Sequence, residues 1–149
     1  MSLKAQIQSD MKDAMRAKEK DRLSVIRMLL AAIQTREIEE RADNLADQDV
    51  LAVIEKLVKQ RKDSAKQFAD AGRDDREAAE LAEADILQAY LPEQMSAEEV
   101  AALVDEVVAA TGASGMQDMG KVMGQLKAKA QGRADMGQLS ALVKAKLSA

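Results

Sequence analysis

Pro92 is the only proline in this chain of 149 residues, and apolar residues recur every three to four positions on both sides of it. That spacing places the apolar side chains of each segment on one helix face, whereas a half-buried strand would require strict alternation. The apolar residues are almost all Ala, Leu, Val, Ile and Met, and Ala, Leu and Met are strong helix formers. The sequence therefore predicts an all-α fold without strands.

Four helices are predicted before Pro92. The first begins near Leu3, Asp21 is expected to cap the second, and the polar residues 43–47 supply the loop and cap that follow. The third and longest helix ends at Gly72, since glycine suits the left-handed residue that closes many helices. The fourth is expected over about residues 75–90.

Pro92 disfavours helical geometry at the preceding residue, and Ser96 to Glu99 have the spacing of a capping box. We therefore expect a domain boundary here, with a four-helix N-terminal domain over residues 1–92 and a three-helix C-terminal domain over residues 93–149. The last two helices are predicted near residues 118–130 and 136–147, with Asp135 capping the final one. Loops this short favour antiparallel neighbours.

Histidine and cysteine are both absent. This removes the usual general base near neutral pH, the commonest metal ligand and any thiolate nucleophile. We therefore expect no catalytic residue, no cofactor and no metal site; an enzyme that uses carboxylates and Tyr90 stays a minority hypothesis. No run of about 18 apolar residues and no signal-peptide stretch occurs, which predicts a cytoplasmic protein that makes no membrane contact.

The net charge of −4 hides a polarised last third. Residues 93–115 hold five acids and no base, whereas residues 116–149 hold six bases and two acids. A second basic cluster lies within residues 56–66. Either basic segment is able to face a polyanion such as RNA.

The segment from Gly115 to Val122 nearly matches a phosphate-binding loop, but Val122 stands where that motif needs Ser or Thr, and no strand precedes it. Gly120 and Gly124 are four residues apart, and we expect them to allow tight packing against a neighbouring helix. The alternative is that the same stretch of backbone approaches a phosphate. Asp118 and Asp135 are interpreted as helix caps.

The run from Lys59 to Phe68 is polar on most of its turns. Such a run is normally a solvated helix face. The alternative is a strip that contacts RNA phosphates and adds affinity without reading sequence.

Several stretches together resemble the GatB/YqeY family, and specifically its short, stand-alone YqeY-type members. They occur in order along nearly the whole chain, at residues 22–30, 58–73, 90–94, 119–126 and 132–135. The resemblance implies that the C-terminal domain is similar to the tail of the B subunit of glutamine-dependent aspartyl/glutamyl-tRNA amidotransferases. In that enzyme the tail engages tRNA, while amide formation belongs to a separate catalytic domain that has no counterpart here.

The family label of a carbon–nitrogen ligase with glutamine as amido donor therefore attaches to this chain only by resemblance. The leading hypothesis is a non-catalytic accessory protein that binds tRNA or another structured RNA; no DNA is expected. The alternative is a helical adaptor that docks on an amidotransferase or an aminoacyl-tRNA synthetase. The candidate RNA-binding residues are Gly120, Lys121, Gly124, Lys127, Lys129, Gly132, Arg133, Lys59, Arg61 and Lys62.

Overall fold

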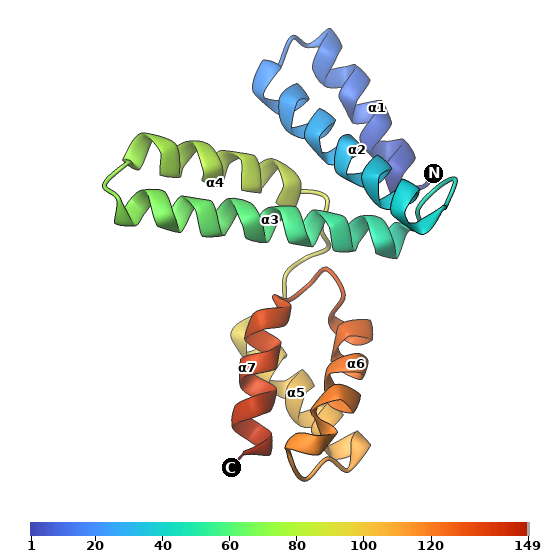
Figure 1. Cartoon of the computed structure of the whole chain (residues 1–149), viewed down its shortest axis with the longest axis vertical. Coiled ribbons are helices and arrows are strands. Elements are labelled where there is room, and N and C mark those ends of the chain that lie inside the picture. The colour runs from blue at the N-terminus through green and yellow to red at the C-terminus, as the bar shows by residue number, and fades with distance from the viewer. Residues whose placement is uncertain (149) are drawn as a thin grey trace. The chain divides into compact units, whose positions relative to one another are not determined.

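The computed structural model describes residues 1–148, and within that range it contains helices and no strands, which confirms the predicted fold class (Figure 1). A short 3-10 turn, Met116–Asp118, precedes the sixth helix and was not predicted. The helices are α1 (Leu3–Arg16), α2 (Lys20–Glu40), α3 (Asp47–Asp70), α4 (Asp74–Gln88), α5 (Ala97–Thr111), α6 (Met119–Ala130) and α7 (Met136–Leu147).

The chain divides into two compact units, Met1–Leu91 and the part that begins at Pro92. Each unit has its own hydrophobic core.

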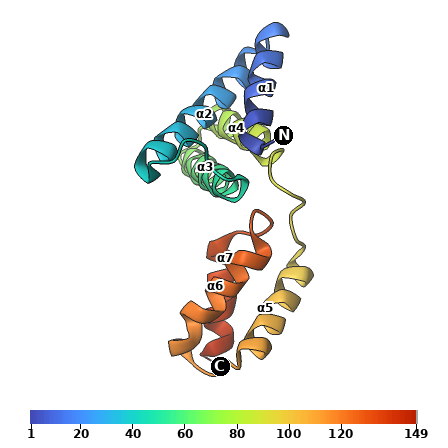
Figure 2. The same cartoon turned by 90° about the vertical axis from the view of Figure 1, so that its right-hand side faces the viewer.

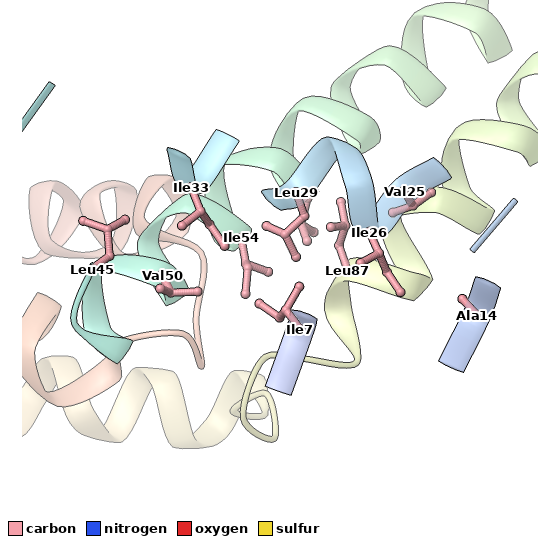
Figure 3. Close-up of a cluster of buried hydrophobic side chains, with 11 residues drawn as sticks. Ile7, Ala14, Val25, Ile26, Leu29, Ile33, Leu45, Val50, Ile54 and Leu87 are labelled. Atoms are coloured by element: carbon pink, nitrogen blue, oxygen red, sulfur yellow. The ribbon is translucent and has the colours of Figure 1, made fainter. Parts of the chain in front are cut away.

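The first unit pairs α1 with α2 and folds α3 back on α4 as an antiparallel hairpin (Figure 1). Its core lies where the four helices meet, and Figure 3 shows Ile7 of α1, Ile33 of α2 and Leu87 of α4 among the side chains that fill it. A fully buried side chain of this size stabilises the fold by about 1.5–3 kcal/mol. Of the α3 side chains, Val50, Ile54 and Val58 belong to this buried cluster.

Glu37 is the one charged side chain that is buried among the described residues, with 7% of its surface exposed. Lys4 donates to both of its carboxylate oxygens at 3.0 and 2.8 Å, and the Leu45 N–H donates to it at 3.1 Å. Lys4 also donates to Asn44 Oδ1 at 3.1 Å. Glu37 thus joins α1, α2 and the loop before α3, and the hydrogen bond from Lys4 is the main cause that lowers its pKa below the ordinary value of 4.5.

A second polar contact lies at the end of α4. The Tyr90 hydroxyl donates to Asp10 on α1. Partial burial, followed by this hydrogen bond, raises the pKa of Tyr90 far above its ordinary value, so the phenol stays protonated. Tyr90 therefore acts as a structural hydrogen-bond donor between α1 and the segment after α4.

Two caps of the first unit differ from the prediction. Asp21 does not cap α2, because the helix begins at Lys20 and Asp21 lies in its first turn. Asp47 does not cap α3 with its side chain; its carboxylate accepts the Leu3 N–H at 2.9 Å and so serves the start of α1 instead. Gly72 has a φ of +71°, which confirms its left-handed position after α3.

The second unit packs α5, α6 and α7 around a core that includes Val104, Leu126 and Leu139 (Figure 2). Ser96 accepts the Glu99 N–H at 3.1 Å and Asp135 accepts the Gly137 N–H at 3.2 Å, which confirms both predicted caps. Asp118 stands at the N-cap position of α6, but its carboxylate accepts the Ser114 N–H at 3.0 Å rather than an α6 amide.

Replacing Glu37 with Gln should lower the urea midpoint of the first unit at pH 7, because Lys4 would lose its charged partner. The Glu37 pKa is lower in the folded state, so its stabilisation is present above about pH 4.5 and is lost as the pH falls through the folded-state pKa. The gap between wild type and Glu37→Gln should therefore shrink on acidification. Fluorescence of Tyr90, the only tyrosine, reports the unfolding of this unit.

Glu39→Gln is the matched control, since Glu39 is an exposed carboxylate of the same helix. Equal midpoints for wild type and Glu37→Gln at pH 7, or a gap that stays constant down to pH 3, would contradict the role assigned to Glu37.

Candidate functional site

Gly120 and Gly124 lie on the exposed side of α6, and a Cβ added at either position would meet no atom within 4 Å. The expectation that they pack tightly against a neighbouring helix is therefore wrong. The core side of α6 is formed by larger residues such as Val122 and Leu126. The two glycines instead leave a stretch of helix backbone open on the outside of the second unit.

Two lysines border this open stretch. At 3.6 residues per turn, Lys127 lies about 20° to one side of Gly120 and Lys121 about 100° to the other. Both side chains are exposed, and neither forms an ion pair within the described residues. Lys121 Nζ lies 3.4 Å from the Thr111 carbonyl oxygen. We call Gly120, Gly124, Lys121 and Lys127 together the α6 face.

The phosphate-loop near-match does not form such a loop. Gly120 and Lys121 belong to the first turn of α6, and the residues before them form the 3-10 turn. The segment therefore presents a helix surface, and not the glycine-rich loop after a strand that cradles a nucleotide.

The other bases of the second unit are largely occupied by the acids of α5. Lys129 lies 3.4 Å from Glu106, and Lys146 forms an ion pair with Asp105. The charge asymmetry seen along the sequence is thus partly compensated in three dimensions. Exposed pairs of this kind contribute at most about 1 kcal/mol each, so their main effect is on the local potential.

Gly132 and Arg133 hold the segment that leads into α5. Gly132 is buried with a φ of +74°, and its carbonyl accepts the Gln94 amide at 2.6 Å. Arg133 donates to the Glu93 carbonyl at 3.0 Å, and its own carbonyl accepts the Met95 N–H at 2.8 Å. These two predicted RNA-binding residues therefore also have a structural task.

The three candidate RNA-binding residues on α3 divide into two exposed lysines and one arginine with a structural role. Lys59 and Lys62 are exposed and form no ion pair within residues 1–148. Arg61 is half-buried, lies 3.7 Å from Glu80 and 3.2 Å from Glu83 of α4, and donates to the sulfur of Met28 on α2. Arg61 thus braces α2, α3 and α4 against one another.

Sequence reasoning missed this brace because its partners lie far away along the chain. The spacing from Arg61 to Glu80 and Glu83 becomes meaningful only once Gly72 has turned the chain back on itself. The same holds for Gln94, whose contact with Gly132 spans 38 positions.

The comparison with protein families is decisive for identity. The model of the family described as Yqey-like protein matches residues 4–147, nearly the whole chain. The chain belongs to the YqeY-like family.

Several fungal relatives of this YqeY-like chain carry the name altered inheritance of mitochondria protein 41, mitochondrial. The relative in Eremothecium gossypii is 39% identical over 103 residues, which is 68% of this chain and 56% of that protein. The relative in Saccharomyces cerevisiae strain YJM789 is 35% identical over 85 residues, which is 57% of this chain and 46% of that protein. The chain thus spans about half the length of the curated relatives it matches.

Helices long and apolar enough to cross a membrane do not occur in the part of this YqeY-like chain that the structure describes.

An open apolar groove lies between α5 and α7, lined by residues that include Ala101, Val104 and Leu142, with the Lys146–Asp105 pair beside it.

Gly124→Ala should stabilise the second unit by about 1 kcal/mol, and Gly120→Ala, in the first turn of α6, by less, because alanine favours the helix and the added methyl group meets no atom. Gly112→Ala should instead destabilise it by about 1–2 kcal/mol, since Gly112 has a φ of +67°. Urea unfolding followed by circular dichroism measures all three. Destabilisation by the α6 substitutions would show that the glycines are packed after all.

Arg61→Gln should destabilise the first unit by about 1–3 kcal/mol, because two carboxylates and the Met28 sulfur would lose their shared partner. Lys59→Gln and Lys62→Gln, on the same helix, should change the free energy of unfolding by less than about 0.5 kcal/mol. Tyr90 fluorescence in urea compares them. A similar small effect for all three variants would remove the distinction between the brace and the exposed lysines.

Proposed function

We propose that this YqeY-like protein is a non-catalytic accessory protein that binds tRNA or another structured RNA through the α6 face of its second unit. The observation that carries the proposal is the open backbone at Gly120 and Gly124. Glycine within a helix costs about 1 kcal/mol relative to alanine. Because no packing contact requires these glycines, close approach of a ligand to the helix is the better account of them.

The chemistry of the α6 face suits a phosphodiester backbone. Without Cβ atoms at positions 120 and 124, a sugar–phosphate chain is able to lie directly against the helix, and Lys121 and Lys127 stand on either side to meet its charge. The two aromatic residues, Phe68 and Tyr90, both belong to the first unit. Recognition by the second unit would therefore depend on RNA shape and backbone and not on base stacking.

The resemblance of residues 119–126 and 132–135 to the tail of the tRNA-dependent amidotransferase B subunit favours tRNA as the RNA class. By that resemblance, the ligase chemistry with glutamine as amido donor would belong to a catalytic domain that has no counterpart in this chain. The proposed role is delivery or retention of RNA for an amidotransferase or an aminoacyl-tRNA synthetase. A cytoplasmic location is part of the proposal; the relatives named above are mitochondrial by name, and the same chemistry would apply in either compartment.

Gly120→Gln combined with Gly124→Gln should abolish high-affinity binding of total tRNA while the helix stays folded, because two long side chains would then cover the open backbone. Lys121→Gln with Lys127→Gln should weaken binding and flatten the plot of log affinity against log salt by about 1–2. Filter binding at several salt concentrations measures both effects. Ala102→Gln, on the exposed side of α5, is the matched control.

A wild-type protein that binds no tRNA at low salt, or a double glycine variant that binds as well as wild type, would overturn the proposal. These variants avoid Arg133, since its contacts to Glu93 and Glu99 make loss of fold an alternative explanation.

The adaptor hypothesis is the second candidate, and the apolar groove between α5 and α7 is the observation that favours it. Leu142→Glu would place a charge in that groove. Capture of an amidotransferase or a synthetase from nuclease-treated lysate by wild type, and its loss with Leu142→Glu but not with the double glycine variant, would favour the adaptor over RNA binding.

A further inference from the structure

The outward face of α3 carries four lysines in line, Lys56, Lys59, Lys62 and Lys66, which we call the α3 stripe. At 100° per residue they fall within an arc of about 120°, opposite the side that carries Val50, Ile54 and Val58. They span about 15 Å along the helix axis. All four are exposed, and none forms an ion pair within the described part of the chain.

Two exposed acids, Asp63 and Asp70, lie on this arc beyond Lys56, and the half-buried Glu55 lies at its near end. The other acids nearby are directed elsewhere: Glu80 and Glu83 face Arg61 on the opposite side of α3. The four lysines with Asp63 and Asp70 therefore hold a local net charge of +2, or +1 when Glu55 is counted, on a unit that is acidic as a whole.

The stripe lies largely on a projecting part of the unit. Past Val58, no α3 residue belongs to the buried cluster shared with α1 and α2, and the last described polar contact to α2 is that of Arg61 with Met28. Figure 1 shows α3 and α4 continuing side by side, away from α1 and α2. Lys62 and Lys66 are thus on a two-helix arm whose outward face no other element of the unit covers.

The residues beside the lysines identify the kind of partner. Gln60, Ser64 and Gln67 border the stripe, so it offers amide and hydroxyl groups and no apolar or aromatic side chain to enter a lipid surface. Regularly spaced ammonium groups with polar neighbours suit a chain of phosphates, which they would bind by charge and without reading sequence.

We propose that the first unit binds RNA phosphates along the α3 stripe, as a second contact separate from the α6 face. The identity of the polyanion as RNA rests on the function proposed above. Because the two faces belong to different units of one chain, binding at one raises the effective concentration of RNA at the other. Arg61 has no part in this contact, since it faces α4.

The test uses the full chain and total tRNA. Lys59→Gln, Lys62→Gln and Lys66→Gln combined should lower the affinity at low salt at least tenfold and flatten the salt dependence by about 2–3, since each lost phosphate contact removes about 0.7–0.9 from the slope. Lys12→Gln, Lys18→Gln and Lys20→Gln combined are the control; these lysines are exposed in the same unit, and their loss changes the net charge equally. Circular dichroism checks that both proteins stay folded.

The possible outcomes distinguish failure of the proposed function from failure of this inference. If wild type binds no tRNA, the proposed function and this inference both fall. If wild type binds and the stripe variant matches the control, this inference is overturned while the α6 face stands. Binding of poly-glutamate that the stripe variant loses, with tRNA affinity unchanged, would assign the stripe to an acidic protein segment and also overturn it.

Discussion

The carboxylate of Glu37 is the contact on which the arrangement of the first unit depends. Apolar burial draws α1, α2 and α3 together, but it is nearly non-directional, and helices with broad apolar faces are able to slide. Glu37 accepts hydrogen bonds from Lys4 of α1 and from the backbone of Leu45, so it fixes α1 and the incoming end of α3 at one level of α2. Asp47 completes the corner by accepting the Leu3 N–H. With this corner in place, α3 leaves the core in a defined direction, and its lysines come to lie on the outside.

Charge is organised differently in three dimensions from its order along the chain. The sequence separates an acidic stretch from a basic one after Pro92, which suggests a strongly positive C-terminal surface. Folding brings α5 beside α6 and α7, so that acids of α5 neutralise Lys129, Lys146 and, at 3.7 Å, Arg133. Among the described residues, Lys121, Lys127 and Lys144 keep no acidic partner, and the first two lie next to the open glycines. On α3, Arg61 likewise pairs with acids of α4, whereas its lysine neighbours form no ion pair within the described residues.

The parts of the fold that sequence predicted are those set by local physics. Apolar periodicity located seven helices, and Gly72, Ser96 and Asp135 marked their ends because caps and left-handed closures involve residues a few positions apart. Asp21 was misassigned, since the helix starts one residue before it, after Glu19. The roles of Asp47, Arg61 and Gln94 were out of reach, because each side chain contacts a group at least 19 positions away. The prediction that Gly120 and Gly124 pack against a neighbouring helix was wrong for a related reason. The GxxxG spacing is the same whether the glycines face a helix or solvent.

The exposed glycines of α6 link the stability of the second unit to its proposed function. Gly124 lies in the interior of this twelve-residue helix and costs about 1 kcal/mol relative to alanine, and Gly120 in the first turn costs less. Neither glycine adopts a positive φ, and neither has a neighbour that an added methyl group would strike. Folding therefore gives no reason for either residue. Two carboxylates of α5, Asp105 and Glu106, are engaged with lysines, and neither lysine belongs to the α6 face. A surface kept bare at a cost in stability, with ammonium groups at its edges, is what close contact with a phosphate chain requires.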